Sequence, residues 1–231
     1  MFETNLFTTV TFLLNRSLNI LEAAPEAGTN FAKTSASLPV AFWALSAIST
    51  ADMITTVSPT YAGEMQSVEG GFGLDGLLRV RSEVVRGVLN GCDLDTWNPK
   101  KDKLLPANFD SKNLANKAKC KAELQKRMGL PVNPNIPVIG IVTRLADQKG
   151  IAEIFAPNYG SIYSICKNMD VQFAILGSGE KWCEDEIANL QNQLPNLKAY
   201  IGYDESLSHL IEAGSDFFLM PSRYEPCGLN Q

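Results

Sequence analysis

The sequence has little histidine and no closely paired cysteines. It contains one histidine, His209, and five cysteines that are widely spaced and form no C-x-x-C motif. Structural zinc sites draw their ligands from closely spaced cysteines and histidines, and disulfide-stapled domains use an even set of cysteines. We therefore expect neither kind of site, and the unpaired cysteines favour a reducing compartment.

Long apolar runs and an excess of basic residues are also missing. The longest apolar stretches near the start, 6–14 and 38–48, are shorter than the roughly 20 residues that cross a bilayer. The start contains Glu3 and no early lysine or arginine, which is unlike a secretory signal. The chain has 20 basic and 25 acidic side chains and a net charge of −5, whereas sequence-blind nucleic-acid binding needs a basic surface. We expect partners that are neither membranes nor nucleic acids.

What remains is the composition of an ordinary globular protein. Hydrophobic residues make up 45% of the chain and charged residues 19%, which excludes the disordered and low-complexity classes. The 231 residues correspond to about one and a half domains of typical size.

A regular alternation of apolar runs and helix-like segments begins at residue 136. The run 138–142 is continuous, which is typical of a strand buried on both faces. Strands and helices that alternate at this spacing predict a parallel, doubly wound α/β sheet. The further strands are expected at 173–176, 199–201 and 217–220, and the helices at 151–166 (interrupted at Pro157 and Gly160), 181–194 and 205–213.

The region before this sheet is less regular. Strand-like runs occupy 53–57 and 84–89, and a helix is predicted over 112–128, ending at Gly129. A tract rich in proline and asparagine follows at 131–137 and is typical of a linker. Residues 1–50 have no clean periodicity, and we leave them unassigned.

Polar residues and glycines follow each strand of the predicted sheet. In open α/β sheets, ligands bind outside the carboxyl ends of the strands. The sequence therefore predicts a ligand site at this edge, built from a cationic pair, a glycine turn, an aromatic ring and a carboxylate. The residues are Arg144 and Lys149 after the first strand, Gly177 and Ser178 after the second, Tyr203 after the third and Glu225 after the fourth.

Each of these residues has a functional and a purely structural interpretation. Arg144 and Lys149 bracket a strand-to-helix turn, where fixed charge beside free backbone N–H groups suits phosphate, but both are equally compatible with solvated surface charges. Gly177 opens a short glycine turn that lacks the third glycine of the dinucleotide-binding fingerprint. Glu225 is placed to orient a sugar hydroxyl or stabilise positive charge, and is otherwise an exposed loop acid. His209, between apolar neighbours on a short helix, is predicted to pack rather than to catalyse.

Four motifs, in the same order along the chain, resemble bacterial glycogen synthases and plant starch synthases. They are ADMITTVSPTYA (51–62), VLNGCD with WNP (88–93 and 97–99), RLADQKG (144–150) and MPSRYEPCGLNQ (220–231). The resemblance implies retaining glucosyltransferases that move α-glucose from ADP-glucose to the non-reducing end of an α-1,4-glucan. It also implies a GT-B fold of two Rossmann-like domains, no metal or other cofactor, and a location in the cytoplasm or, for plant members, the plastid stroma.

The resemblance also implies roles for individual residues. Arg144 and Lys149 neutralise the donor pyrophosphate, and Glu225 lies beside the transferred glucose. Tyr203 lies near the adenine, Asn90 contacts the sugar or a phosphate, and the glycine turn at Gly177 and Ser178 lines the donor site. Residues expected in the terminal loop, with backbone N–H groups directed toward phosphate, are Cys227, Gly228 and Leu229.

The family's Lys-x-Gly-Gly loop, His-Asp-Trp segment and later Thr-Gly-Gly segment do not occur in this sequence. We therefore expect a fragment: 51–130 from the end of the first, acceptor-side domain, and 131–231 from the start of the second, nucleotide-sugar-binding domain. By itself such a fragment is expected to be inactive. Two alternatives stay open: a non-catalytic remnant that binds nucleotide or glucan, and a related enzyme that uses UDP-glucose.

Overall fold

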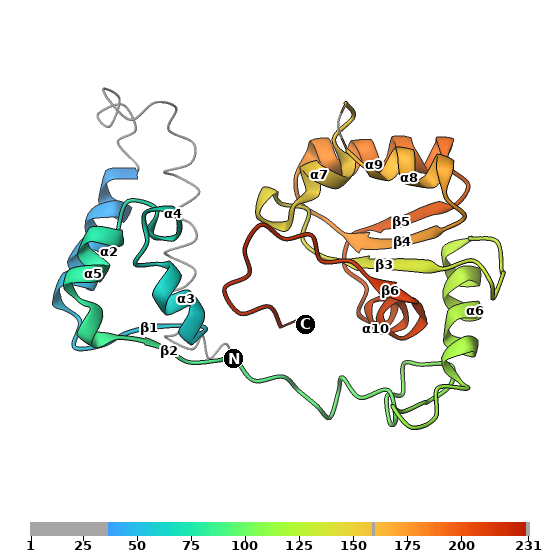
Figure 1. Cartoon of the computed structure of the whole chain (residues 1–231), viewed down its shortest axis with the longest axis horizontal. Helices are drawn as coiled ribbons and strands as arrows, with labels where there is room; N and C mark the ends of the chain where they lie inside the picture. Colours follow the sequence, from blue (N-terminus) through green and yellow to red (C-terminus); the bar gives the residue numbers. More distant parts are fainter. Residues whose placement is uncertain (1–36, 159, 230–231) are drawn as a thin grey trace. The chain divides into compact units, whose positions relative to one another are not determined.

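The computed structural model describes residues 37–158 and 160–229 of the chain, with side chains from residue 44 onward. These residues fall into two compact units (Figure 1). The larger unit comprises Cys92–Glu225, and the smaller unit comprises the residues up to Gly91 together with those from Pro226 onward.

The larger unit is built on a four-stranded sheet in which every pairing is parallel. The strands lie in the order β5-β4-β3-β6. Their bounds are Val138–Val142 for β3, Gln172–Gly177 for β4, Leu197–Ile201 for β5 and Phe217–Phe218 for β6. The parallel α/β sheet predicted from the sequence is confirmed, and β3 has the predicted bounds.

Helices cover both faces of this sheet, as Figure 1 illustrates. On one face lie α7 (Ile151–Phe155), α8 (Ile162–Asn168) and α9 (Lys181–Gln193). On the other face, α6 (Lys117–Met128) and α10 (Glu205–Gly214) pack against each other and against the strands. This two-sided coverage explains why the sheet residues form continuous apolar runs rather than an alternating pattern.

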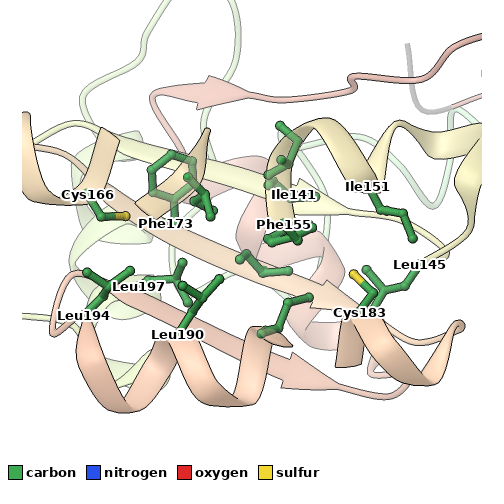
Figure 2. Packing of buried hydrophobic residues seen from close by; sticks show 14 of the residues in the cluster. Ile141, Leu145, Ile151, Phe155, Cys166, Phe173, Cys183, Leu190, Leu194 and Leu197 are labelled. Atoms are coloured by element: carbon green, nitrogen blue, oxygen red, sulfur yellow. The ribbon is translucent and has the colours of Figure 1, made fainter. Parts of the chain in front are cut away.

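The core under α7, α8 and α9 fixes the strands that carry the candidate site (Figure 2). Strand β4 is buried along its whole length, and Phe173 and Ile175 point from it into this core. They meet Leu190 from α9 and Phe155 from α7. Leu145, which follows β3, is also fully buried here, so the start of the turn after β3 is anchored by packing.

The helix-like segment predicted at 151–166, with interruptions at Pro157 and Gly160, forms two helices, α7 and α8. The Gly160 N–H donates to Ala156 O at 2.7 Å, and the Ser161 N–H donates to Glu153 O at 3.0 Å. The helical pattern is therefore broken between Phe155 and Ile162, at the interruption that the sequence indicated.

Helix α6 belongs to the larger unit, whereas the sequence analysis grouped 51–130 as one domain. Its buried Cys120 and Leu124 pack in the same core as Leu210 and Ile211 of α10. The compact units thus divide after Gly91, and the smaller unit lacks the helix. That the two units derive from the first and second domains of the family stays a prediction.

The stretch that leads into α6 is tied to α10 by the single histidine. His209 is buried, and its Nδ1 shares a 2.6 Å hydrogen bond with Asp102 Oδ2. The ring of Trp97 stacks on the imidazole with centroids 3.7 Å apart. The prediction that His209 packs is confirmed.

The smaller unit contains two short parallel strands, β1 (Ile54–Thr56) and β2 (Val85–Gly87). Its core gathers Ile48, Ile54, Leu78 and other apolar residues. The helices are α2 (Ser37–Thr50), α3 (Pro59–Glu64), α4 (Val68–Gly71) and α5 (Asp75–Val80). Of the unassigned residues 1–50, those before 37 lie outside the described residues. Across 37–158 and 160–229, the structure contains no helix with the length and apolarity that a membrane span requires.

Candidate functional site

The sheet of the larger unit changes direction next to β3. From β3 the chain continues to β4 and β5 on one side, and then returns to form β6 on the other side of β3. Ligands of open α/β sheets bind at such a switch point, outside the carboxyl ends of the two flanking strands. The turn that follows β3 and the loop that follows β6 start at this position.

The turn after β3 is held by its neighbours in the sheet. The Leu145 N–H donates to Ser178 O at 2.9 Å, and the Glu180 N–H donates to Leu145 O at 2.7 Å, which continues the β3–β4 pairing beyond both strands. A 3₁₀ turn, Asp147–Lys149, follows. It ends at Gly150, which has a φ of +66°, a conformation that favours glycine.

Gly150 also allows the two site segments to approach each other. A Cβ added at this position would lie 2.1 Å from the carbonyl oxygen of Pro221 in the loop after β6. Gly177 has a comparable role between β3 and β4, since a Cβ there would lie 2.1 Å from Thr143 O. Both glycines are therefore required by close backbone contact.

The expectation of free backbone N–H groups at this turn is not met for three of them. The Asp147 N–H donates to Glu180 Oε1 at 2.9 Å, the Lys149 N–H to Ala146 O at 2.8 Å, and the Gly150 N–H to Asp147 O at 2.9 Å. These donors are used to close the turn itself. The positive character of the turn therefore comes from its side chains.

The central contact of the site joins the turn and the loop. Lys149 Nζ donates to Glu225 Oε1 at 2.5 Å, and the Ser222 hydroxyl donates to the same oxygen at 2.5 Å. The ion pair is largely shielded from water, because the Lys149 and Glu225 side chains are 18% and 15% exposed. The two residues that the sequence assigned to opposite charges of one site are thus brought into direct contact.

Several effects act on the Glu225 carboxyl. Burial alone would raise its pKa, but the hydrogen bonds from Lys149 and Ser222 and the charges of Lys149 and Arg144 outweigh burial and lower it. The carboxylate is therefore held in its ionised form. An ionised carboxylate in a shielded site can stabilise positive charge that develops on a bound molecule.

Arg144 lies in the turn after β3 and is exposed. Its Nη2 donates to Gln148 Oε1 at 3.3 Å, and Gln148 Nε2 donates in turn to Tyr224 O at 3.2 Å. Gln148 thus connects the second predicted cation to the loop after β6. The two cations and the carboxylate are held within one hydrogen-bonded assembly.

The remaining predicted residues of the larger unit lie along the same edge of the sheet. Gly177 is buried at the end of β4, and Ser178, which follows it, is exposed. Tyr203 follows β5, the strand at the opposite end of the sheet from β6, and its side chain is 82% exposed. Their predicted roles toward a donor stay predictions.

Four predicted residues group with the smaller unit. Asn90 follows β2 and is exposed, and Cys227, Gly228 and Leu229 belong to the segment that starts at Pro226. The structure does not bring these residues into the compact unit that holds Lys149 and Glu225. Their predicted contacts with sugar and phosphate are untested.

Three residues that shape the site were not predicted from the sequence: Ser222, Gln148 and Arg223. Ser222 precedes Glu225 by three residues in a loop after a strand, and serine and glutamate at that spacing could have indicated a local side-chain hydrogen bond. Gln148 and Arg223 contact residues about 75 positions away in the sequence, and short-range patterns contain no signal for such contacts.

The chain is similar to known glycogen and starch synthases. Residues 16–80 match the family model described as the starch synthase catalytic domain. This match includes residues 16–50, for which the sequence pattern gave no assignment. Glycogen synthase of Treponema denticola is 56% identical over 185 residues, 80% of this chain and 38% of the relative. Glycogen synthase of Anaeromyxobacter dehalogenans strain 2CP-1 is 51% identical over 182 residues, 78% of this chain and 37% of the relative. The chain thus spans little more than a third of the length of these relatives.

Two solved structures share the fold. The catalytic domain of starch synthase IV from Arabidopsis thaliana, bound to ADP and acarbose, superposes with a TM-score of 0.73 at 40% identity. That match covers 81% of this chain and 38% of the plant chain. Sucrose-phosphate synthase from Thermosynechococcus elongatus, with a TM-score of 0.51 at 16% identity over 92% of this chain and 44% of its own, shares the fold alone. Both are GT-B glycosyltransferases, so the predicted fold class is confirmed.

Proposed function

Because the chain belongs to the family of bacterial glycogen synthases and plant starch synthases, we propose that it forms part of an enzyme that transfers glucose from ADP-glucose to the non-reducing end of an α-1,4-glucan. In this reaction the bond between the anomeric carbon and the diphosphate breaks, and a bond from that carbon to the acceptor hydroxyl oxygen forms. The hydroxyl proton passes to the departing diphosphate, and ADP leaves. The proposal needs no metal or cofactor, and it locates the enzyme in the cytoplasm or a plastid stroma.

The observation that carries the proposal is the Lys149–Glu225 pair at the switch point of the sheet. Rupture of a bond to diphosphate leaves negative charge on phosphate and positive charge on the anomeric carbon. A fixed cation and a fixed anion side by side match these two charges, and preorganised charges of this kind lower the barrier.

Lys149 and Arg144 are the groups that we assign to the diphosphate. An ammonium group has three donors, so Lys149 can bond a phosphate oxygen while it keeps its contact with Glu225. Arg144 is exposed beside it and supplies a planar guanidinium, which suits phosphate oxygens. Glu225, held ionised by these cations and by Ser222, is assigned to the side of the anomeric carbon.

The resemblance to the family suggests roles for the other predicted residues. Tyr203 is assigned to the adenine, and Gly177 and Ser178 to the turn beside the donor. Asn90 is assigned to the sugar or a phosphate. Cys227, Gly228 and Leu229 contribute backbone N–H groups to phosphate. The plant starch synthase IV domain was solved with ADP and acarbose, and the ADP supports an adenine nucleotide as a ligand of the proposed enzyme.

A hybrid enzyme tests the proposal. In Treponema denticola glycogen synthase, the 185 matched residues are replaced by those of this chain, and transfer of labelled glucose to glycogen is measured from ADP-glucose and from UDP-glucose. We expect transfer from ADP-glucose that requires Lys149. A hybrid that is folded by circular dichroism but transfers glucose from neither donor would contradict the proposal and favour a non-catalytic binding role. Preferential transfer from UDP-glucose would contradict the assigned donor.

A further inference from the structure

The loop after β6 is bound to the turn after β3 by contacts that do not involve Lys149 or Glu225. The Arg223 N–H donates to Gln148 O at 2.9 Å, and Gln148 Nε2 donates to Tyr224 O at 3.2 Å. The carbonyl of Pro221 lies against Gly150. These contacts align the two backbones, and side-chain contacts of the loop add lateral restraint.

The Arg223 side chain supplies that lateral restraint. Its Nη1 lies 2.6 Å from Asp147 Oδ2, and its Nε and Nη2 lie 3.0 and 2.9 Å from Glu153 Oε1. Asp147 precedes Lys149 by two residues, and Glu153 follows it by four, at the start of α7. One guanidinium therefore holds both sides of the segment that carries Lys149.

Arg223 itself precedes Glu225 by only two residues. Any shift of the Arg223 backbone relative to Asp147 and Glu153 would also move Glu225 relative to Lys149. A guanidinium is suited to this task because it is planar and binds two carboxylates in fixed directions, which an ammonium group does not do.

The ion pairs themselves are open to solvent. Arg223, Asp147 and Glu153 are 46%, 59% and 53% exposed, and exposed ion pairs contribute little to the free energy of unfolding. The main effect of these ion pairs is therefore not on the free energy of unfolding. Orientation of the loop is the effect that their geometry provides.

We propose that Arg223 is a positioning residue, whose ion pairs with Asp147 and Glu153 hold the loop after β6 so that Glu225 stays against Lys149. For catalysis, this inference rests on the proposed function, since the Lys149–Glu225 pair is the proposed centre of charge stabilisation. As a statement about the geometry of the pair, it is testable without any substrate.

The test is a carbon-13 NMR titration of the Glu225 carboxyl in the 231-residue chain, assigned with the Glu225→Gln variant. In the unmodified chain the pKa of Glu225 is lowered by Lys149 and Ser222 against the effect of burial. If Arg223 positions the loop, Arg223→Gln raises the pKa of Glu225 toward its ordinary value. Arg223→Lys also raises it, although the positive charge is retained, because an ammonium group does not bridge the two carboxylates.

A double substitution of the two carboxylates that Arg223 binds separates loop positioning from simple electrostatics. The two explanations predict shifts of the Glu225 pKa in opposite directions. Asp147→Asn with Glu153→Gln removes two negative charges, and simple through-space electrostatics would then lower the pKa of Glu225 further. Loss of loop position would raise it, because Lys149 is withdrawn from the carboxylate. The double variant also serves if Arg223→Gln fails to fold.

The control is Arg127→Gln, which removes an arginine that pairs with Asp204 in the same unit. We expect the pKa of Glu225 to be the same in this variant as in the unmodified chain. An unchanged or lowered pKa in Arg223→Lys and in the double variant would overturn the inference. Because no nucleotide is present in the titration, failure of the chain to bind ADP would count against the proposed function alone.

Discussion

Lys149 Nζ lies 2.5 Å from Glu225 Oε1, although the two residues are 76 positions apart in the sequence. The contact exists because β3 and β6 are adjacent in the sheet while the chain between them forms β4 and β5. The fold thereby places one cation and one anion at the point where open α/β sheets bind ligands. The proposed chemistry depends on this pair.

The first prediction concerns the ammonium group of this pair. In the hybrid glycogen synthase, Lys149→Ala is expected to lower kcat by about 10²–10³, the usual scale for loss of one electrostatic contact to the transition state. The control is Lys181→Ala, which removes an exposed lysine paired with Asp185 on α9 and should leave kcat unchanged. Equal kcat values for Lys149→Ala and the parent hybrid would refute the assignment.

The second prediction concerns the pH dependence of stability. Because the folded state lowers the pKa of Glu225, the ion pair stabilises the protein fully above the unfolded-state pKa. This stabilisation is lost as the pH falls through the lowered folded-state pKa. Between about pH 6 and about pH 3, the free energy of unfolding should therefore fall less in Glu225→Gln than in the unmodified chain.

Urea titrations at a series of pH values measure this difference. Other carboxyls with a lowered pKa, such as that of Asp204, contribute equally to both proteins and cancel in the comparison. Parallel pH profiles for the two proteins would mean that Glu225 gains nothing from Lys149 in the folded state.

The third prediction concerns the close approach of the two site segments. Gly150→Ala places a methyl group 2.1 Å from Pro221 O in addition to the strain of a positive φ, so the loop after β6 must move. The matched control is Gly129→Ala, where φ is +71° but no heavy atom lies within 4 Å of the added Cβ.

Both variants should lose about 1 kcal/mol from backbone strain, and Gly150→Ala should lose about 1–3 kcal/mol more from the steric contact. Chemical denaturation measures the difference. If the two variants are equally stable, the loop does not lie against Gly150 in solution.

Much of the larger unit could be predicted from the sequence, because its strands are buried on both faces. Continuous apolar runs predicted the observed bounds of β3, and those of β4 to within one residue at each end. Helix α6 starts at Lys117 rather than at residue 112, because Asp110 Oδ1 accepts hydrogen bonds from the Lys112 and Asn113 N–H groups and forms a local turn. Such competition between side chain and helix is not visible from propensity alone.

The site was predictable in its residue types but not in its contacts. The strand ends identified Lys149 and Glu225, since strand order in a doubly wound sheet brings carboxyl ends together. The partners that orient them were missed, because Arg223 and Gln148 act through contacts between distant segments. Helix α6 groups with the larger unit through packing against α10, which is again a contact between distant segments.

The fourth prediction concerns the buried histidine. His209→Ala removes the stacking on Trp97 and the hydrogen bond to Asp102 Oδ2, so that the buried carboxyl keeps only the Leu104 N–H, on its other oxygen. A loss of about 2–4 kcal/mol in the free energy of unfolding is expected. Asp102→Asn, which keeps an oxygen beside Nδ1, should lose less. A loss below about 0.5 kcal/mol for His209→Ala would show that this cluster does not secure residues 97–102 to α10.

The central claim is that the Lys149–Glu225 site of this chain binds the diphosphate of an adenine nucleotide. Isothermal titration calorimetry of the 231-residue chain with ADP tests it most directly, with Lys149→Ala and Lys181→Ala measured in parallel. The account predicts saturable binding of ADP that is unchanged in Lys181→Ala and about 10-fold or more weaker in Lys149→Ala. Absence of binding heat at millimolar ADP, or equal affinities in all three proteins, would contradict it.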